Sequence, residues 1–166
     1  MDELAARLTS LHLQPMNMDS FQAVPESELE ELERSIGEQL PNDYRWFLKH
    51  YGKSLFKEAV ICPTTRTESI PFMFFYGPNA SGNGVLRKYE FHQGEFPTGF
   101  VPIGEASFGD LYLLASKGPH RGSVYYWCHD AGGWEGEDED YSSFETIAPS
   151  FTDFIFHLVP VSDDAE

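Results

Sequence analysis

Apolar side chains in the first third of the chain recur with the spacing of α-helices. A short amphipathic helix is expected over residues 4–13, with an apolar stripe of Leu4, Leu8 and Leu11. A second helix is expected over residues 26–40, because acidic residues fill its first turn, where the helix dipole favours them, and Pro41 follows it. A third is expected over residues 43–51, where Gly52 suits the C-terminal end. The apolar stripe of the second helix is Leu29, Leu32, Ile36 and Leu40. That of the third helix is Tyr44, Phe47, Leu48 and Tyr51.

The pattern then changes to short apolar runs separated by Gly, Pro, Asn or Ser, which is typical of strands. The expected strands are residues 59–62, 70–76, 85–91, 100–103, 111–115 and 123–128. The polar segment before the fifth of these strands closes on Gly109 and Asp110, which predicts a hairpin between the fourth and the fifth. We expect Asp110 to hold this turn by accepting backbone N–H bonds; the alternative is that it lines a cleft.

A final amphipathic helix closes the pattern. Ser150 is a suitable N-cap, Asp153 stands three residues later, and Pro160 ends the helix. Its stripe is Phe151, Phe154, Ile155 and Leu158. The order of elements predicts an α+β fold, with an antiparallel or mixed sheet of about five to six strands against which the N-terminal helices and one C-terminal helix pack. A chain of 166 residues is expected to form one domain.

The charge is strongly negative, at −16, and unevenly distributed. Residues 104–166 contain 13 of the 27 acidic residues, against only Lys117 and Arg121 among the bases. Such a field repels phosphate and disfavours nucleic-acid binding, whereas it attracts a basic partner and speeds the encounter with it. Solubility alone is the alternative explanation for the acidic composition.

Several features favour a cytoplasmic location. The chain lacks an apolar run of about 18 residues, so no membrane span is expected. The acidic start at Asp2 and Glu3 does not match a secretory signal, which needs a basic segment followed by an apolar one. Without export, Cys62 and Cys128 are expected to be reduced, buried thiols. The oligomeric state is left open.

The residue types that carry chemistry do not form a recognisable catalytic or metal motif. Cys128, His129 and Asp130 are consecutive, and neighbours on a strand point to opposite faces, so a shared metal is not expected. A G-x-S-x-G nucleophile motif is absent. We therefore expect no catalytic residue, no cofactor and no metal, although a Ser–His–acid set assembled from distant positions remains open. Trp127, on an apolar strand, is expected in the core.

An acidic run near the C-terminal end is the main candidate for partner binding. It is bordered by Trp134 and Tyr141, and its carboxylates are Glu135, Glu137, Asp138, Glu139 and Asp140. Aromatic residues beside charges are enriched in binding hot spots, so one hypothesis is a partner-facing loop; the other is a solvated connection. The spacing does not match a calcium-binding loop. Trp46, off the apolar face of its helix, is a second interface candidate.

Four motifs follow one another along the chain. The first is Leu40-Pro41 with Asp43-Tyr44 and Phe47-Leu48, and the second is Ile70-Pro71-Phe72 with Phe74-Phe75-Tyr76-Gly77. The third is Phe100-Val101-Pro102-Ile103-Gly104 with Gly109-Asp110, followed by Val124-Tyr125-Tyr126-Trp127 and His129. The fourth is Ile147-Ala148 with Ser150-Phe151, Phe154 and Leu158. In their joint order and spacing they resemble the SUKH superfamily of Smi/Knr-like domains, over residues 24–159. Cys128 departs from the pattern, since an acidic residue is frequent there.

The resemblance implies a non-enzymatic protein-binding domain. It implies most of all an immunity protein that neutralises a cognate bacterial toxin, such as a nuclease or deaminase with a basic active site, by occluding that site. The alternative is a regulator or scaffold of the fungal cell-wall-signalling type, and a lesser one is a small-ligand-binding domain or hydrolase. Residues 1–23 are then expected to be a helical extension and linker, residues 24–159 the domain, and residues 160–166 an acidic tail.

Overall fold

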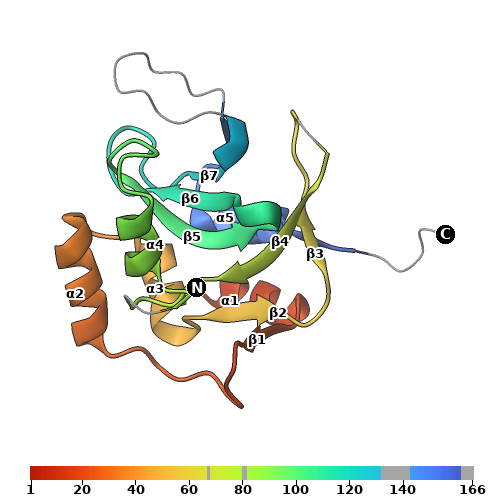
Figure 1. Ribbon diagram of the computed structural model, residues 1–166. Coiled ribbons are helices and arrows are strands. Elements are labelled where there is room, and N and C mark those ends of the chain that lie inside the picture. Colours follow the sequence, from red (N-terminus) through yellow and green to blue (C-terminus); the bar gives the residue numbers. More distant parts are fainter. Residues whose placement is uncertain (67, 80–81, 132–142, 162–166) are drawn as a thin grey trace.

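The computed structural model describes residues 1–66, 68–79, 82–131 and 143–161, and these form an α+β fold, as expected (Figure 1). Its helices are α1 (Asp2–Ser10), α2 (Glu26–Ile36), α3 (Asn42–His50), α4 (Val85–Phe91) and α5 (Phe151–His157). Its strands are β1 (Leu13–Pro15), β2 (Ser54–Phe56), β3 (Val60–Cys62), β4 (Ile70–Phe75), β5 (Phe100–Ala106), β6 (Leu111–Ala115), β7 (Val124–Trp127), β8 (Phe144–Ala148) and β9 (Val159–Pro160). None of the described helices is long and apolar enough to cross a bilayer.

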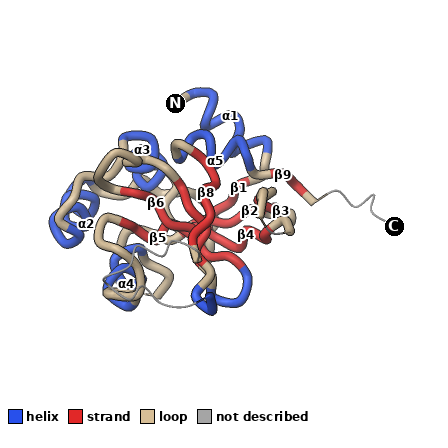
Figure 2. Tube along the Cα trace, turned by 90° about the horizontal axis from the view of Figure 1, so that it is seen from above, coloured by secondary structure: helices blue, strands red, loops and turns tan. Residues whose placement is uncertain are grey.

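All of the strands pair antiparallel in one sheet, in the order β1-β2-β4-β5-β6-β7-β8, while β3 pairs with β4 and β9. The strands occupy the centre of the molecule and the helices lie around them (Figure 2). The hairpin expected near Gly109 is present, because β5 and β6 pair from Phe100 with Ala115 to Glu105 with Leu111. The short turn η1 (Ser107–Gly109) connects them.

The sequence prediction was wrong at residues 85–91, which form α4 rather than a strand. The segment carries Arg87, Lys88 and Glu90 in its interior, so it lacks the alternation of a half-buried strand. Its apolar residues Val85 and Tyr89 are four apart, as one face of a helix requires. This face packs on the core, and α4 contacts α2 and β5.

The second and first helices end earlier than their apolar stripes suggested. The α2 helix stops at Ile36 because Gly37 takes a left-handed conformation with φ of 76°, which glycine adopts without steric cost. The α1 helix stops at Ser10, and Leu13 instead begins β1, which pairs with β2.

The N-terminal segment belongs to the same core as the rest of the chain. Leu4, Leu8 and Leu11 are buried, with exposures of 1%, 0% and 3%. Across the contact between α1 and α5, the Arg7 guanidinium donates to the carbonyl of Leu158 at 2.6 Å, which satisfies a backbone acceptor at the end of α5. Residues expected to form an extension thus supply one wall of the core.

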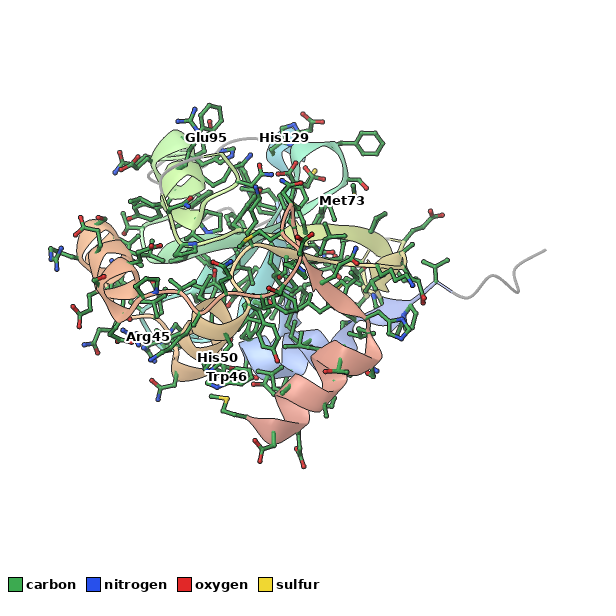
Figure 3. The ribbon with its side chains drawn as sticks, turned by 90° about the horizontal axis from the view of Figure 1, so that it is seen from below. Arg45, Trp46, His50, Met73, Glu95 and His129 are labelled. Carbon is green, nitrogen blue, oxygen red and sulfur yellow. The ribbon has the colours of Figure 1, made fainter. Side chains whose placement is uncertain are left out.

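An apolar side chain of β4 lies at the surface. Pro71 and Met73 are the outward residues of the alternating first part of the strand, and Met73 is half exposed. The register between β4 and β5 then shifts between Phe72 and Phe74, as a β-bulge produces. Figure 3 shows Met73 on the side of the molecule that carries Glu95 and His129, away from Trp46 and His50.

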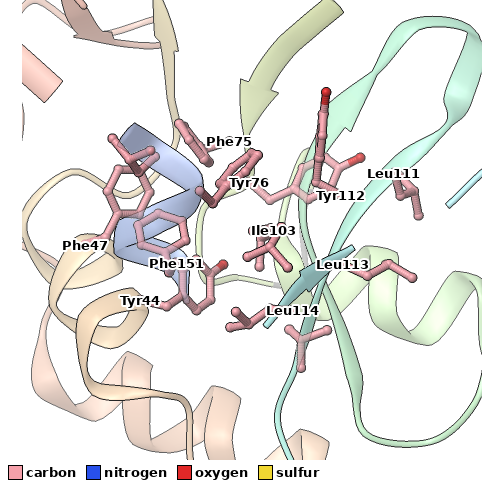
Figure 4. Close-up of a cluster of buried hydrophobic side chains, with 14 of the residues drawn as sticks. Tyr44, Phe47, Phe75, Tyr76, Ile103, Leu111, Tyr112, Leu113, Leu114 and Phe151 are labelled. Atoms are coloured by element: carbon pink, nitrogen blue, oxygen red, sulfur yellow. The ribbon is translucent and has the colours of Figure 1, made fainter. Parts of the chain in front are cut away.

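Aromatic rings from distant segments form the centre of the core (Figure 4). The centroid of the Phe47 ring on α3 lies 4.6 Å from the ring centroid of Phe75 on β4 and 4.9 Å from that of Phe151 on α5. The Tyr44 ring is 5.1 Å from that of Phe151. Trp127 is 1% exposed, as its sequence context suggested. Aromatic pairs at these distances add to the stabilisation that burial provides, and they fix α3 and α5 against the sheet.

A buried carboxylate fastens the β3–β4 loop to the edge strand β8. Glu145 is 5% exposed. Its carboxylate accepts hydrogen bonds from the backbone N–H groups of Thr65, at 2.9 Å, and Arg66, at 3.2 Å. The Arg66 guanidinium donates to the carbonyl of Phe144 at 2.7 Å. These charge-assisted bonds join segments about 80 residues apart in the chain, where no strand pairing does so.

We expect Glu145→Ala to lower the free energy of unfolding by about 1–3 kcal/mol, because it removes hydrogen bonds to a charged group that is shielded from water. Urea denaturation of the purified variant measures this loss. Thr146→Ala, at the exposed neighbouring position on β8, is the control and should change the free energy by about 0.5 kcal/mol or less. Equal effects from the two variants would contradict the structural role of Glu145.

Candidate protein-binding surface

Most of the residues that the sequence pointed to lie outside the described part of the chain. These are Trp134, Glu135, Glu137, Asp138, Glu139, Asp140 and Tyr141. They follow directly in sequence on the turn η2 (His129–Ala131), which is described.

Trp46 lies on α3 and is half-buried rather than fully exposed. Its ring is 4.7 Å from the imidazole of His50 and 5.7 Å from the ring of Tyr51, and it packs against the core. His50 also forms a hydrogen bond through Nδ1 with the carbonyl of Trp46 at 2.8 Å. Part of the side chain therefore serves the packing of α3, and the remainder is open to solvent.

A different surface gathers exposed apolar groups around charged ones. We name it the η face and define it by Met73, Phe91, Glu95, Phe108, His129 and Asp130. Among the described residues, Phe108 and Phe91 are the most exposed large hydrophobic side chains, at 95% and 70%. Figure 3 shows Glu95 and His129 along one side of the molecule.

Contacts between neighbouring side chains connect the parts of the η face. The Phe91 ring lies 4.8 Å from that of His92, and the His92 ring lies 5.5 Å from that of Trp127 in β7. His92 also bonds the Glu95 carboxylate through Nδ1, at 2.7 Å. On the other side, Gly109 sits against His129, so that a methyl group on Gly109 would stand 3.7 Å from the ring. The end of α4 thus contacts β7 through His92, and η1 contacts η2 through Gly109 and His129.

Phe108 has an unfavourable backbone conformation for its residue type. Its φ of 63° and ψ of 22° are left-handed, and a bulky side chain rarely adopts them. The conformation costs about 1–2 kcal/mol relative to the right-handed one. The turn needs it, because β5 and β6 are joined through Phe108 and Gly109, and both have positive φ. A glycine or asparagine at position 108 would meet the same requirement with less strain.

Asp110 holds η1 and η2 together. One carboxylate oxygen accepts the backbone N–H of His129 at 3.0 Å and bonds the imidazole Nδ1 of His129 at 2.6 Å. The other oxygen accepts the hydroxyl of Tyr126. Asp110 is 9% exposed, so these bonds lie largely out of water. It does accept a backbone N–H bond, as expected from its place after a glycine, but the donor is on η2 rather than in its own hairpin.

His129 is held between two carboxylates. Its Nε2 lies 3.1 Å from the Asp130 carboxylate, while Nδ1 faces Asp110. The bond to Asp110 raises the pKa of His129 above its ordinary value, desolvation opposes this, and the nearby charges of Asp130, Asp110 and Glu95 raise it further. The imidazolium form is therefore favoured, and both ring nitrogens act as donors.

The described residues were searched for groups that could hold a metal ion or act as a base or nucleophile. They contain no group of three or more His, Cys, Asp or Glu that could hold a metal ion. His129 has its Nε2 engaged by Asp130, so neither ring nitrogen is placed as a free base. Burial raises the pKa of the Cys62 thiol to about 12, which keeps it protonated and unreactive. Both cysteines are free thiols, but Cys128 is only partly buried, whereas burial was expected for both.

Sequence reasoning missed the apolar part of the η face. Phe108 was read as part of a polar turn, and Phe91 was assigned to a strand that does not exist. A signal was present, since a phenylalanine between Ser107 and Gly109 is an apolar residue in an otherwise small and polar turn. Met73 carried none, because β4 is almost continuously apolar and its sequence does not show which of the two alternating faces points outward.

Comparison with known proteins agrees with the motifs in the sequence. The model of the SMI1-KNR4 cell-wall family, SUKH_6, matches residues 26–155. The chain is also similar to a protein of Bacillus subtilis strain 168 described as the SPbeta prophage-derived uncharacterized protein YokK. The two are 30% identical over 159 residues, which cover 84% of this chain and 78% of the relative. The chain therefore belongs to the SMI1-KNR4 family of the SUKH superfamily.

Proposed function

We propose that the chain is an immunity protein, which binds a cognate bacterial toxin and blocks the toxin's active site without catalysing a reaction itself. The observation that carries this proposal is family membership over residues 26–155, because SUKH domains are known for immunity proteins. The Bacillus relative is described as prophage-derived, which supports a bacterial role over cell-wall regulation of the fungal kind.

Electrostatics supports inhibition of an enzyme that acts on a polyanion. A nuclease must present basic side chains to the phosphates of its substrate. A chain with a net charge of −16 is attracted to such a surface, and the attraction raises the rate of association. Bound there, the chain excludes the substrate by occupying the same space and by repelling its phosphates.

The arrangement of His129 supports a binding role over a hydrolytic one. A catalytic histidine needs one ring nitrogen hydrogen-bonded to a nucleophile and the other to an orienting group. In this chain both nitrogens face carboxylates, those of Asp110 and Asp130. Such a histidine ties two turns together through its bonds to the two carboxylates.

Co-expression tests the proposed function. The gene beside that of this chain is expressed from an inducible promoter in a host that lacks both genes, with and without the chain. We expect growth to stop with the neighbouring gene alone and to recover when the chain is also expressed. A neighbouring product that is not toxic, or toxicity that the chain does not relieve, would contradict the proposal.

The acidic run is proposed as an electrostatic contribution to binding. Replacing Glu137, Asp138, Glu139 and Asp140 together by serine should weaken affinity for the toxin by about 10- to 100-fold at low salt, with a smaller effect as salt is raised. Isothermal titration at several salt concentrations measures both quantities.

The control for the acidic run removes the same charge elsewhere. It replaces Asp2, Asp19, Glu28 and Glu30, which are all exposed, by serine. If both quadruple variants lose affinity equally, net charge alone accounts for the effect and the run has no special place. An unchanged affinity in the first variant would remove the run from the binding surface but would leave the proposed function standing.

A further inference from the structure

We propose that the η face is the surface that docks on the toxin, with Phe108 as its central anchor. The part of the toxin that it contacts is a concave, basic surface with an apolar pocket for the Phe108 ring. The inference rests on the proposed function and adds to it the place and the chemistry of contact. Its first support is the exposure of apolar groups: Phe108 and Phe91 exceed the other large hydrophobic side chains of the described residues in exposure, and the half-exposed Met73 lies on the same side of the molecule as Glu95 and His129 (Figure 3).

The second support is the conformation of Phe108. The side chain is 95% exposed, so it contributes little to the packing of the described core. Its φ of 63° is unfavourable for a phenylalanine but not for a glycine. The residue thus costs stability at a position where its ring gains almost none by burial. An exposed aromatic group held in a strained conformation is a feature of functional contacts, where the ring is buried only in the complex.

The third support is the charge around the ring, which identifies the occupant. Asp130 is paired with His129 and Glu95 bonds His92, but the Asp130 side chain is 83% exposed and that of Glu95 is 51% exposed, so a partner's cations also reach both carboxylates. The imidazole of His129 faces Asp110 and Asp130, and Lys88 faces Glu105 at 3.6 Å, so these cations are already paired. Arg87 on α4 is the remaining base close by in the chain. Arginine or lysine side chains of a partner complement this arrangement.

The charge also discriminates against other occupants. A second copy of the chain has the same net charge of −16, so self-association would bring two strongly like-charged molecules together. Anionic lipid headgroups are repelled for the same reason. The shape agrees with a basic enzyme as the partner, because a protruding ring fits a hollow, and the substrate cleft of a nuclease is both hollow and basic.

The test uses the toxin that the chain relieves in co-expression, as a purified and catalytically inactivated protein, and measures its affinity for variants by isothermal titration. Phe108→Gly should weaken binding by about 100-fold or more and Phe91→Ser by about 10-fold. Phe156→Ser is the matched control, since that phenylalanine is 48% exposed on α5; it should stay within about 3-fold of the parent.

A thermal melt separates loss of contact from loss of folding. Because glycine tolerates the left-handed conformation, Phe108→Gly should melt at the same temperature as the parent or higher, although it binds less. Weak binding together with unchanged or increased stability supports the inference. If the parent chain protects and binds, and the affinity of Phe108→Gly for the toxin is within about 3-fold of the parent's, the η face is not the docking surface, while the proposed function stands.

Light scattering tests the competing occupant. A parent chain that is dimeric, with a Phe108→Gly variant that is monomeric, would assign the η face to self-association and overturn the inference. If the parent chain neither protects nor binds, the proposed function fails, and the inference that rests on it fails too. The failures can be told apart. Unchanged binding by Phe108→Gly, or a dimer that this variant disrupts, overturns only the η face and leaves protection by the parent chain intact. Loss of protection by the parent chain overturns the proposed function.

Discussion

Replacing Leu8 by alanine is expected to lower the free energy of unfolding by about 2–5 kcal/mol. Leu8 has an exposure of 0%, on the face of α1 that belongs to the core. Its loss leaves a cavity between α1 and the rest of the molecule, and the fixed helix and sheet cannot collapse to fill it. The size of this effect follows from close packing, in which each missing methyl group loses contacts that nothing replaces.

Deletion of residues 1–15 extends the same argument and should abolish cooperative folding. It removes the buried side chains of Leu4, Leu8 and Leu11 together with the strand that pairs with β2. The family model begins at residue 26, so a fragment cut at that boundary would lose this wall of the core. Urea denaturation followed by tryptophan fluorescence measures both changes.

The control in α1 is Ala6→Ser, on the exposed face of the helix, which should alter the free energy by about 0.5 kcal/mol. If Leu8→Ala cost no more than this control, and the shortened chain still unfolded cooperatively, α1 would be an appendage rather than part of the core.

The second large effect is expected at Asp110. Asp110→Asn weakens the bond to the imidazolium of His129 and disturbs those from the Tyr126 hydroxyl and the His129 N–H. We expect a loss of about 2 kcal/mol in the free energy of unfolding, because these are largely buried bonds to a charged group. Without these bonds η1 and η2 should also separate, which should reduce the affinity for the partner.

The pH dependence of this loss has a definite sign. The pKa of His129 is raised in the folded protein, first by the bond to Asp110 and then by the neighbouring charges of Asp130 and Glu95. The contribution of the imidazolium is therefore complete below the unfolded pKa, near 6.5, and disappears as the pH rises through the raised folded value. The difference in stability between the parent chain and Asp110→Asn should be largest in mildly acid solution and smaller in alkaline solution.

Denaturation across this pH range, together with NMR titration of the His129 ring, checks both parts of the prediction. Asp110→Asn should lower the pKa of His129. A stability difference that stays constant with pH would show that the imidazolium takes no part, and an unchanged pKa would contradict the contact with Asp110.

The sequence predicted the larger elements because their apolar patterns are long enough to be specific. Helices α2, α3 and α5 each have three or more apolar residues on one face and a boundary residue such as Gly37 or Pro160. The strands β1, β2 and β9 have only two or three residues, which is too few for alternation to be recognised. Their formation depends on pairing with distant strands, which no local pattern records.

The candidate surface could be predicted only in part, for a related reason. Asp110 was identified from its place after Gly109, but its partners Tyr126 and His129 come from another hairpin. The exposure of Phe108 depends on where the turn points once the sheet has formed. The apolar content of β4 gave no sign that Met73 would be exposed, because both faces of the strand carry apolar residues and only the packed fold shows which face points outward.

The central claim is that the chain neutralises a toxin by occluding its active site, and a kinetic titration tests it most directly. The toxin's activity on its substrate is measured at increasing concentrations of the chain and at several substrate concentrations. We predict complete inhibition at one chain per toxin, with an apparent inhibition constant that rises linearly with the substrate concentration, because chain and substrate compete for one surface. Inhibition that is independent of substrate concentration, or activity that persists with the chain in excess, would contradict the claim.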